Sequence, residues 1–373
     1  MYIWVLTIAL VLAVGYLLLM GFYGLGWWRL PIFYLDSNAV PDLFITVLIP
    51  ARNEAAGIAD TLSALHQCVY PRHLLEILVL NNGSTDQTAQ IVQNWIIQHP
   101  KSNVSLVELG DIGKKNAITE GVHRAKGSHI VCTDADCAPP VQWLLLLESA
   151  FIQHQPKLIT APVLIHKECS LLEWFQSLDL LGLMGITASG IFFKWQHMAN
   201  GANMAYPKST FYDVNGYEGN THIASGDDLF LVQKVAKQWP GSVFFLKNAD
   251  AAVKTKAMPN WRAFIRQRVR WGSKNVALPE WPVRLSLLLV LLVCLVTVAF
   301  AIGICFDRGF VVPFALLFVA KWIADLVFLG AMGRFFNKQE TMRWFFPAQI
   351  LHTLYITLIG FVSLVWRDKE GNW

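Results

Sequence analysis

The sequence predicts an α/β domain with a mostly parallel β-sheet, accompanied by one amino-terminal and about three carboxy-terminal transmembrane helices. Hydrophobic residues make up 54% of the 373 residues and charged residues only 15%, against roughly a quarter charged in an ordinary soluble domain. The excess apolar residues gather toward the two ends of the chain. Between them, short β-branched runs alternate with segments of helical periodicity, which is the pattern of βαβ units.

The first element is an apolar segment, 1–28, that carries no charged residue. It is long enough to cross a bilayer, which takes about 20 helical residues. It lacks the basic n-region of a secretory signal and runs on into Trp27, Trp28 and Arg29. We therefore interpret it as an uncleaved membrane anchor and not as a signal peptide.

A domain of ordinary polar content is predicted over 36–282. Its strands are expected at 45–49, 76–80, 104–109 and 129–133, where the runs are apolar and β-branched. Helices are expected between them, at 55–67, 85–98 and 114–125, where apolar residues recur at helical spacing. Such an alternation predicts a sheet covered on both faces, with ligands bound beyond the carboxyl ends of the strands.

Polar side chains follow three of these strands at that edge. Asp134 and Asp136 come directly after a strand, so both carboxylates can turn toward one divalent cation. Mg²⁺ commonly binds through one or two carboxylates together with substrate phosphates. An acidic pair in a loop is more often a solvated turn, but its position after a strand favours a metal site. The candidate residues at this edge are Arg52, Glu54, Asn81, Asn82, Asp134 and Asp136.

Two further segments contribute charged candidates. Lys114 opens a predicted helix, and it is either a solvated lysine or a cation that neutralises a leaving diphosphate. Asp227 and Asp228 precede a helical pattern over 229–237, where helix capping and the helix dipole alone favour carboxylates. The functional interpretation is that Asp228 acts as a general base on an acceptor hydroxyl.

Two further helices are predicted, an apolar one near 169–200 and a basic one near 259–276. The first has a broad apolar face but an uncharged core too short to span, so it lies either at the membrane interface or in the soluble core. The second is basic, which alone is typical of an anchor to anionic headgroups. It also contains Gln267, Arg270 and Trp271, whose spacing lets an amide, a guanidinium and an indole converge on one ligand.

The remaining spans are predicted in a carboxy-terminal bundle over 283–373, at about 285–306, 310–333 and 344–366. Lys321 and Asp325 interrupt the second of these and can neutralise each other on one helix face. Basic residues after the first span and between the last two predict that both places are cytoplasmic. We therefore expect an inner-membrane protein with a cytosolic α/β domain. A nucleic-acid partner is not expected, since the soluble region has no basic run interleaved with aromatic residues.

Four motifs occur in order along the chain: Ile49-Pro50-Ala51-Arg52-Asn53-Glu54, Asn81-Asn82-Gly83-Ser84-Thr85-Asp86, Asp134-Ala135-Asp136, and Asp227-Asp228 followed by the QxxRW motif, Gln267-Arg268-Val269-Arg270-Trp271. With these motifs the chain resembles the membrane-bound branch of glycosyltransferase family 2 over about 45–271. That branch contains ceramide glucosyltransferases, bacterial carotenoid glycosyltransferases, and cellulose and hyaluronan synthases. The resemblance implies the GT-A fold and inverting transfer from a nucleotide sugar with Mg²⁺ or Mn²⁺.

The resemblance also implies roles for these residues. The donor side would be formed by Arg52, Glu54, Asn81, Asn82, Lys114 and Asp134, and the metal would be held by Asp136 with Asp134. Asp228 would be the base, and the diphosphate and acceptor would meet Asp227, Gln267, Arg270 and Trp271. The family usually has Asp-Asp where this chain has Asn81-Asn82. The carboxylates of Asp would only accept hydrogen bonds from the base or ribose, whereas the amides of Asn can donate as well as accept. UDP is still the expected donor nucleotide.

The predicted function is transfer of one sugar, or very few, from a UDP-sugar to a hydroxyl of a membrane lipid. A single-transfer enzyme is favoured because the spans are almost free of polar residues, and a polysaccharide channel needs a polar path. One alternative is a processive polysaccharide synthase with a channel between subunits. Another is a non-catalytic receptor or scaffold, for which Asn81-Asn82 is the supporting feature. The sequence leaves the sugar, the acceptor and the oligomeric state open.

Overall fold

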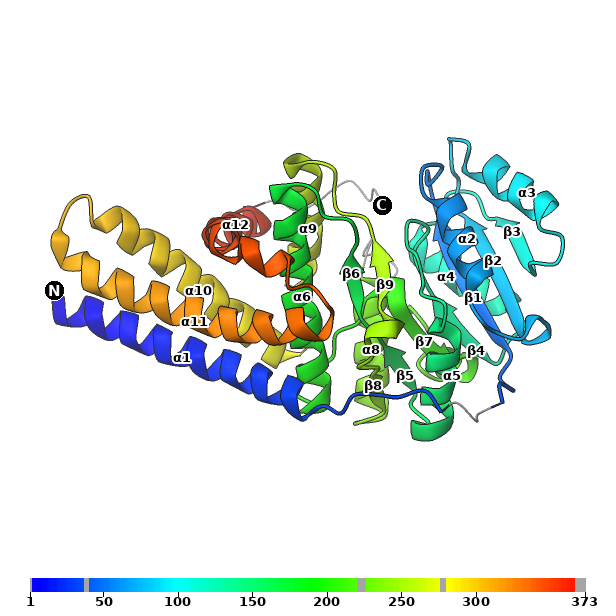
Figure 1. The fold of residues 1–373 in the computed structure, drawn as a ribbon, viewed down its shortest axis with the longest axis horizontal. Helices are drawn as coiled ribbons and strands as arrows, with labels where there is room; N and C mark the ends of the chain where they lie inside the picture. The colour runs from blue at the N-terminus through cyan, green and yellow to red at the C-terminus, as the bar shows by residue number, and fades with distance from the viewer. Residues whose placement is uncertain (1, 37–39, 220–225, 276–279, 366–373) are drawn as a thin grey trace. The chain divides into compact units, whose positions relative to one another are not determined.

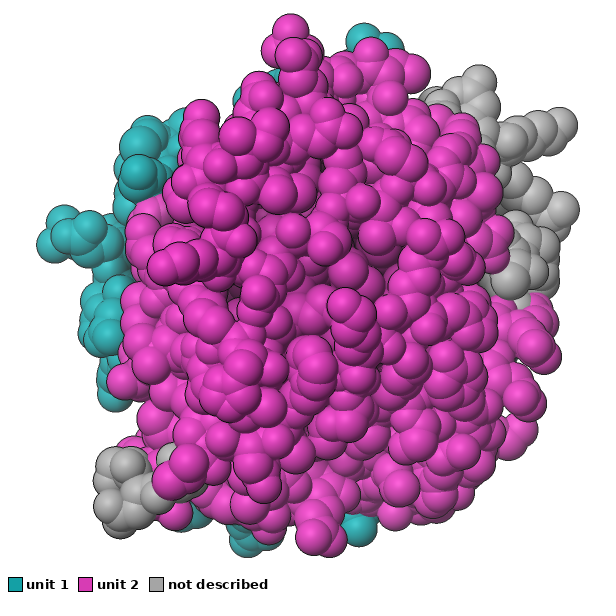
Figure 2. Space-filling model, turned by 90° about the vertical axis from the view of Figure 1, so that its right-hand side faces the viewer, with its two compact units in different colours: residues 1–30, 167–196, 257–369 teal, residues 31–166, 197–256, 370–373 magenta. Residues whose placement is uncertain are grey.

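A computed structural model describes residues 2–36, 40–219, 226–275 and 280–365, and their contacts divide the chain into two compact units (Figure 1). The α/β unit comprises 31–166 and 197–256, together with 370–373 outside the described residues. The helical unit comprises 1–30, 167–196 and 257–369. Figure 2 shows the surface of the α/β unit in magenta.

A seven-stranded sheet with the order β3-β2-β1-β4-β7-β5-β8 forms the α/β unit's core. In its parallel half, β1 (Ile45–Ala51) lies between β2 (Leu75–Asn81) and β4 (His129–Cys132), and β2 pairs with β3 (Val104–Glu108). Every residue of β1 and of β2 is buried, as expected for parallel strands covered on both faces. The four strands expected from the sequence are confirmed, with small shifts at their ends.

The other half of the sheet contains antiparallel pairings that the sequence analysis did not predict. β7 (Met204–Pro207) runs antiparallel to β4 and to β5 (Leu158–Thr160), and β8 (Val243–Phe245) pairs parallel with β5. Cys132 at the end of β4 lies opposite Met204 at the start of β7. The residues that precede β7 therefore come to the carboxyl edge of the sheet.

Helices α2 (Ile58–Gln67), α3 (Thr88–Gln98) and α4 (Lys114–Arg124) occupy the segments expected to be helical. α4 packs on β1 and β2, where a Cβ added to Gly121 would lie 2.6 Å from a Leu80 methyl carbon, so this close approach requires glycine. The remaining elements of the unit are α5 (Trp143–His154), α7 (Lys208–Asp213), α8 (Asp227–Gln238), β6 (Val163–Ile165), β9 (Val253–Thr255), η1 (Arg72–Leu74), η2 (Gly201–Asn203) and η3 (Ala249–Ala251).

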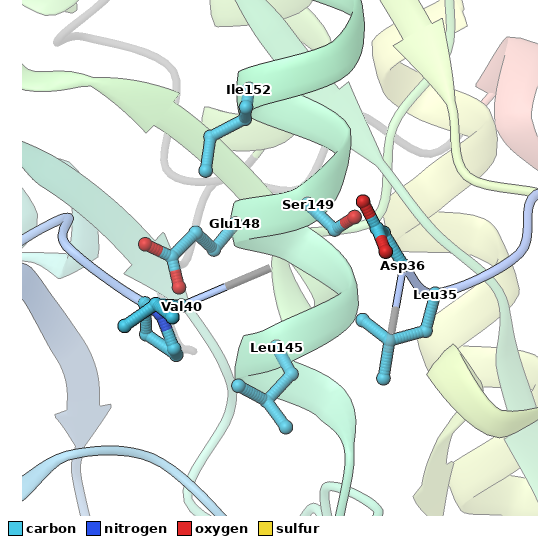
Figure 3. Close-up of a pocket in the computed structure, with 8 residues that line it drawn as sticks. Leu35, Asp36, Val40, Leu145, Glu148, Ser149 and Ile152 are labelled. Carbon is cyan, nitrogen blue, oxygen red and sulfur yellow. The ribbon is translucent and has the colours of Figure 1, made fainter. Parts of the chain in front are cut away.

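A small pocket lies beside α5 (Figure 3). Glu148 of α5 accepts hydrogen bonds of 2.8 Å from the backbone N–H groups of Asp42 and Leu43, just before β1. This carboxylate therefore fastens the chain at the amino end of β1, whereas Arg52 follows its carboxyl end. The pocket is lined by Leu35, Asp36, Val40, Pro41, Leu145, Glu148, Ser149 and Ile152.

Five described helices of the helical unit are long and apolar enough to cross a membrane, so the chain is a membrane protein. Four of them match the spans expected from the sequence, and α6 is the fifth. They are α1 (Tyr2–Arg29), α6 (Leu171–Phe192), α10 (Trp281–Gly303), α11 (Val311–Phe335) and α12 (Phe345–Val365), with the short η4 (Arg308–Phe310) and η5 (Thr341–Trp344) between them.

The α6 segment is buried, but its neighbours differ from those expected. It packs against α1, α11 and α12 within the helical unit, whereas the sequence analysis placed it at the membrane interface or in the soluble core. Leu172, Phe175 and Leu178 join a core cluster with side chains of α9 (Trp261–Asn275), α11 and α12. The physical reason is that α6 is apolar on most of its circumference, which suits a helix surrounded by others.

A buried polar cluster links α1, α11 and α12. Lys321 donates hydrogen bonds of 2.6 Å to Asp325 and to Gln349, and the Tyr16 hydroxyl donates one of 2.6 Å to Asp325. The expected mutual neutralisation of Lys321 and Asp325 is confirmed. All four side chains are buried, so these polar groups satisfy one another and are shielded from water.

Candidate active site

An acidic turn, residues 134–136, follows β4 at the carboxyl edge of the sheet. Asp134 accepts a hydrogen bond of 2.7 Å from the Lys114 ammonium at the start of α4, so two candidates far apart in sequence lie together. The turn packs closely on the beginning of α2, where a Cβ added to Gly57 would lie 3.2 Å from the Asp136 Cα. Thr61 donates a 2.8 Å hydrogen bond to the carbonyl of Ala135. Sequence reasoning missed Gly57 and Thr61, which become supports of the turn only through tertiary packing.

Glu54 adds a third negative group to this place. Burial, and after it the charges of Asp136 and Asp134, raises the pKa of Glu54 to about 7, while Lys114 opposes the rise. Burial and the charge of Asp134 also raise the pKa of Asp136. Carboxylates whose ionisation is opposed in this way are stabilised by a bound cation.

The donor set fits Mg²⁺ or Mn²⁺ shared with a phosphate-bearing ligand. Within the described part of the chain, no group of three or more His, Cys, Asp or Glu side chains is arranged to hold a metal ion. Asp136 and Asp134 would therefore supply only part of the coordination shell. Phosphate oxygens commonly complete such a shell around Mg²⁺.

The loops after β1 and β2 are joined by side-chain hydrogen bonds. Asn53 adopts a positive φ of 57°, which Asn tolerates better than most residues. Its Oδ1 accepts a 2.8 Å hydrogen bond from the N–H of Thr85. The N–H of Glu54 donates a 2.8 Å hydrogen bond to the hydroxyl of Thr88, the first residue of α3. The first two motifs therefore form one rigid pair of loops, and Thr88 is a supporting residue that the sequence analysis missed.

The remaining donor-side candidates contact the end of β3 and the segment after it. Arg52 forms a 2.7 Å ion pair with Asp111. Asn81 donates a 2.6 Å hydrogen bond to Glu108. Asn82 is fully buried, and its Oδ1 accepts a 3.0 Å hydrogen bond from a backbone N–H of the same segment. Asp111 and Glu108 were not singled out from the sequence, because they join this edge only through the pairing of β2 with β3.

Asp228 lies in the first turn of α8. Its Oδ1 accepts a 2.7 Å hydrogen bond from the N–H of Leu229, and its Oδ2 accepts one of 3.1 Å from the N–H of Gly201. Gly201 leads into β7, whose start lies beside the end of β4. Asp228 is therefore fastened at the same edge of the sheet as the acidic turn. Asp227 also begins α8, and its side chain lies outside the described residues.

The three QxxRW candidates, Gln267, Arg270 and Trp271, belong to α9 in the helical unit. Arg268, which the motif leaves unspecified, is buried and forms a 2.7 Å ion pair with Asp179 of α6. Its guanidinium lies 4.1 Å from the centre of the Trp271 ring, a distance suited to a cation–π contact. Arg268 and Asp179 thus orient Trp271, a role the sequence could not reveal because it depends on how α6 packs.

Comparisons with known proteins show what the chain is similar to. The family model described as Glycosyl transferase family 2 matches residues 46–215, which contain β1 to β7 and the first three motifs. The chain therefore contains a glycosyltransferase family 2 domain. It is 26% identical to a poly-β-1,6-N-acetyl-D-glucosamine synthase of Staphylococcus epidermidis, over 86% of this chain and 78% of that protein. It is 27% identical to the probable glycosyltransferase YdaM of Bacillus subtilis, over 62% of this chain and 55% of that protein.

A solved structure supports the fold of this glycosyltransferase. The mannosyltransferase PcManGT from Pyrobaculum calidifontis, in complex with GDP-Man and Mn²⁺, superposes with a TM-score of 0.61 and 20% sequence identity. The likeness covers 98% of this chain and 100% of that one. The predicted GT-A fold with membrane helices is confirmed, and the enzyme is a family 2 glycosyltransferase.

Proposed function

We propose that this glycosyltransferase moves one sugar from a nucleotide-sugar donor to a hydroxyl of a membrane lipid, with inversion at the anomeric carbon. The observation that carries the proposal is the position of Asp228. Hydrogen bonds from Gly201 and Leu229 fix its carboxylate at the sheet edge that also carries the acidic turn. The same edge of the sheet therefore offers a base for the acceptor hydroxyl and carboxylates that can hold a cation beside the leaving diphosphate.

The catalytic role of Asp228 follows from this arrangement. The carboxylate takes the proton of the acceptor hydroxyl as its oxygen attacks the anomeric carbon. The bond from that carbon to the diphosphate breaks on the opposite face, so a single displacement inverts the configuration. The nucleoside diphosphate leaves with the bonding electron pair.

The leaving side is formed by Asp136, Asp134 and Lys114. The two carboxylates would hold a divalent cation which, when bound, neutralises charge developing on the diphosphate. Lys114 lies against Asp134 at 2.7 Å, where its ammonium can contribute to the same neutralisation. In support, PcManGT holds GDP-Man and Mn²⁺ within the same fold. Arg52, Asn81 and Asn82 would surround the nucleoside end of the donor, and Glu54, which lies beside the acidic turn, would meet the donor nearer its diphosphate.

The acceptor side is proposed to involve the helical unit. α9 carries Gln267, Arg270 and Trp271, and its Phe264 is fully buried in a cluster with α6, α11 and α12. The QxxRW motif is therefore built on helices of membrane type, which suits an acceptor whose tail stays in lipid. We propose that these three residues and Asp227 close over the diphosphate and acceptor on the cytoplasmic side of the membrane.

A processive polysaccharide synthase is the second candidate. It is favoured by the similarity to the staphylococcal synthase, which extends over 86% of this chain. The described spans favour single transfer instead, because the polar residues Tyr16, Lys321, Asp325 and Gln349 are buried against one another. A sugar chain crossing the bilayer needs hydrogen-bonding groups that face an open path.

Product size distinguishes the two candidates. The purified full-length enzyme is incubated with membrane lipid extract, Mn²⁺ and, separately, labelled UDP-glucose, UDP-N-acetylglucosamine or GDP-mannose. Single transfer predicts one discrete labelled glycolipid with one of these donors. A ladder of long, water-soluble chains would instead establish the synthase. The Asp228→Asn variant serves as the matched control, because it should form either product about 10²- to 10⁴-fold more slowly.

A further inference from the structure

The paired ends of β2 and β3 present a carboxylate beside the amide of Asn81. Asn81 is the last residue of β2 and lies opposite Glu108, the last residue of β3, in their parallel pairing. The Asn81 Nδ2 donates a 2.6 Å hydrogen bond to Glu108 Oε2, and its Oδ1 accepts one of 3.3 Å from the N–H of Ser84. Asn81 is buried, whereas Glu108 is exposed. The group that this pair offers to a ligand is therefore the Glu108 carboxylate.

Asn81 gives that carboxylate a fixed orientation. Both ends of the amide are engaged within the protein, so rotating the Asn81 side chain would break two hydrogen bonds. A hydrogen bond to an ionised acceptor is stronger than one between neutral groups. A carboxylate can accept several hydrogen bonds, so Glu108 keeps acceptor capacity for a ligand donor. The pair thus presents an oriented, acceptor-only group.

The position of Glu108 along the edge corresponds to the far end of a nucleotide. The strand order β3-β2-β1-β4 puts three strand spacings between the end of β3 and the acidic turn after β4. At ~4.8 Å per spacing, this is about 14 Å, close to the length of an extended nucleoside diphosphate. With the diphosphate at the acidic turn, the nucleobase would reach β2 and β3.

We infer that Glu108, oriented by Asn81, selects a donor nucleobase that carries a ring N–H on its hydrogen-bonding edge, as uracil and guanine do. The carboxylate accepts that N–H, whereas cytosine presents a ring nitrogen acceptor at the equivalent position and is repelled. The inference rests on the proposed function, since it needs a nucleotide at this edge. Asn81 then acts as a positioning residue. The carboxylate that the motif lacks at Asn81 is supplied by Glu108 of the neighbouring strand.

The test measures nucleotide binding by calorimetry in the presence of Mn²⁺. The wild-type enzyme should bind UDP or GDP more tightly than CDP, and more tightly than the N3-methyl derivative of UDP if uracil is the base. Glu108→Gln should weaken binding of the preferred nucleotide by about 10- to 100-fold, as expected for loss of a hydrogen bond to a charged group. It should leave CDP binding nearly unchanged. Glu120→Gln, on the α4 surface beside Arg124 at 2.6 Å, is the control and should change neither.

Moving the carboxylate from position 108 to position 81 distinguishes recognition of the nucleobase from a purely structural role of Glu108 at the sheet edge. Asn81→Asp places two carboxylates side by side and should weaken binding, whereas Asn81→Asp combined with Glu108→Gln restores one carboxylate and should recover the preference for UDP or GDP. Equal losses for all nucleotides in Glu108→Gln, or no loss at all, would overturn the inference while leaving the proposed function intact. Failure of the wild-type enzyme to bind any nucleoside diphosphate would defeat both.

Discussion

Replacement of Asp228 by Asn is expected to slow the chemical step of sugar transfer by about 10² to 10⁴, the range for general acid–base catalysis. The Asn amide cannot take a proton from the acceptor hydroxyl. Its single oxygen can still accept one of the two backbone hydrogen bonds, from Gly201 or Leu229, that Asp228 receives. The first turn of α8 should therefore keep its shape. Single-turnover transfer from a labelled donor measures the chemical step, and calorimetry with the nucleotide should show unchanged binding.

Asp227→Asn is the matched comparison for this result. It removes the same charge from the neighbouring position of α8, and its effect on the chemical step should be milder. If Asp227→Asn were the more damaging change, the base would be Asp227 and the assignment of Asp228 would be wrong. A parallel fall in nucleotide affinity in both variants would point to a disturbed loop instead of a lost base.

Asp136→Asn is expected to abolish transfer and to weaken Mn²⁺ binding in the presence of nucleotide. Asp136 and Asp134 are the carboxylates proposed to hold the cation, and the amide removes one of their two charges. Burial, and after it the charges of neighbouring carboxylates, raises the pKa of both Asp136 and Glu54, so negative charge at this place is poorly solvated and crowded. The fold should survive, because burying one charge fewer relieves that crowding. Electron paramagnetic resonance of Mn²⁺ reports binding independently of activity.

Asp60→Asn provides the control for the metal experiment. Asp60 lies on α2, with its side chain 77% exposed and a 3.5 Å ion pair to Lys256, so its loss should alter neither Mn²⁺ binding nor transfer. Activity of the wild-type enzyme should disappear in excess chelator and return with Mg²⁺ or Mn²⁺. Full turnover in excess chelator would contradict a metal-assisted leaving group.

The parallel half of the sheet was predictable because its strands are buried on both faces. Such strands appear in sequence as uninterrupted apolar, β-branched runs, and β1 and β2 are each seven residues long. β5, β6, β8 and β9 are each three residues long, too short to show a period. β7 has four residues and pairs antiparallel with β4. No local sequence pattern predicts this change of pairing direction.

The candidate site was predictable at its motif residues and not at the residues that support them. Asp228 could be found from its sequence context, but its attachment to Gly201 depends on the antiparallel pairing of β7. Glu108 becomes a candidate residue only because the strand register places it opposite Asn81. Arg268 and Asp179 become partners only when α6 and α9 pack together. Local sequence therefore predicted the candidate residues, and the residues that support them depend on tertiary structure.

The anomeric configuration of the product tests the central claim most directly, because direct displacement with Asp228 as the base must invert the sugar. The wild-type enzyme is given an α-linked nucleotide sugar with lipid acceptor and Mn²⁺, and the purified glycolipid is examined by proton nuclear magnetic resonance. For a glucose-type sugar, the coupling between the protons on carbons 1 and 2 distinguishes the anomers. A β-linked product is predicted. An α-linked product would contradict single displacement and the role assigned to Asp228.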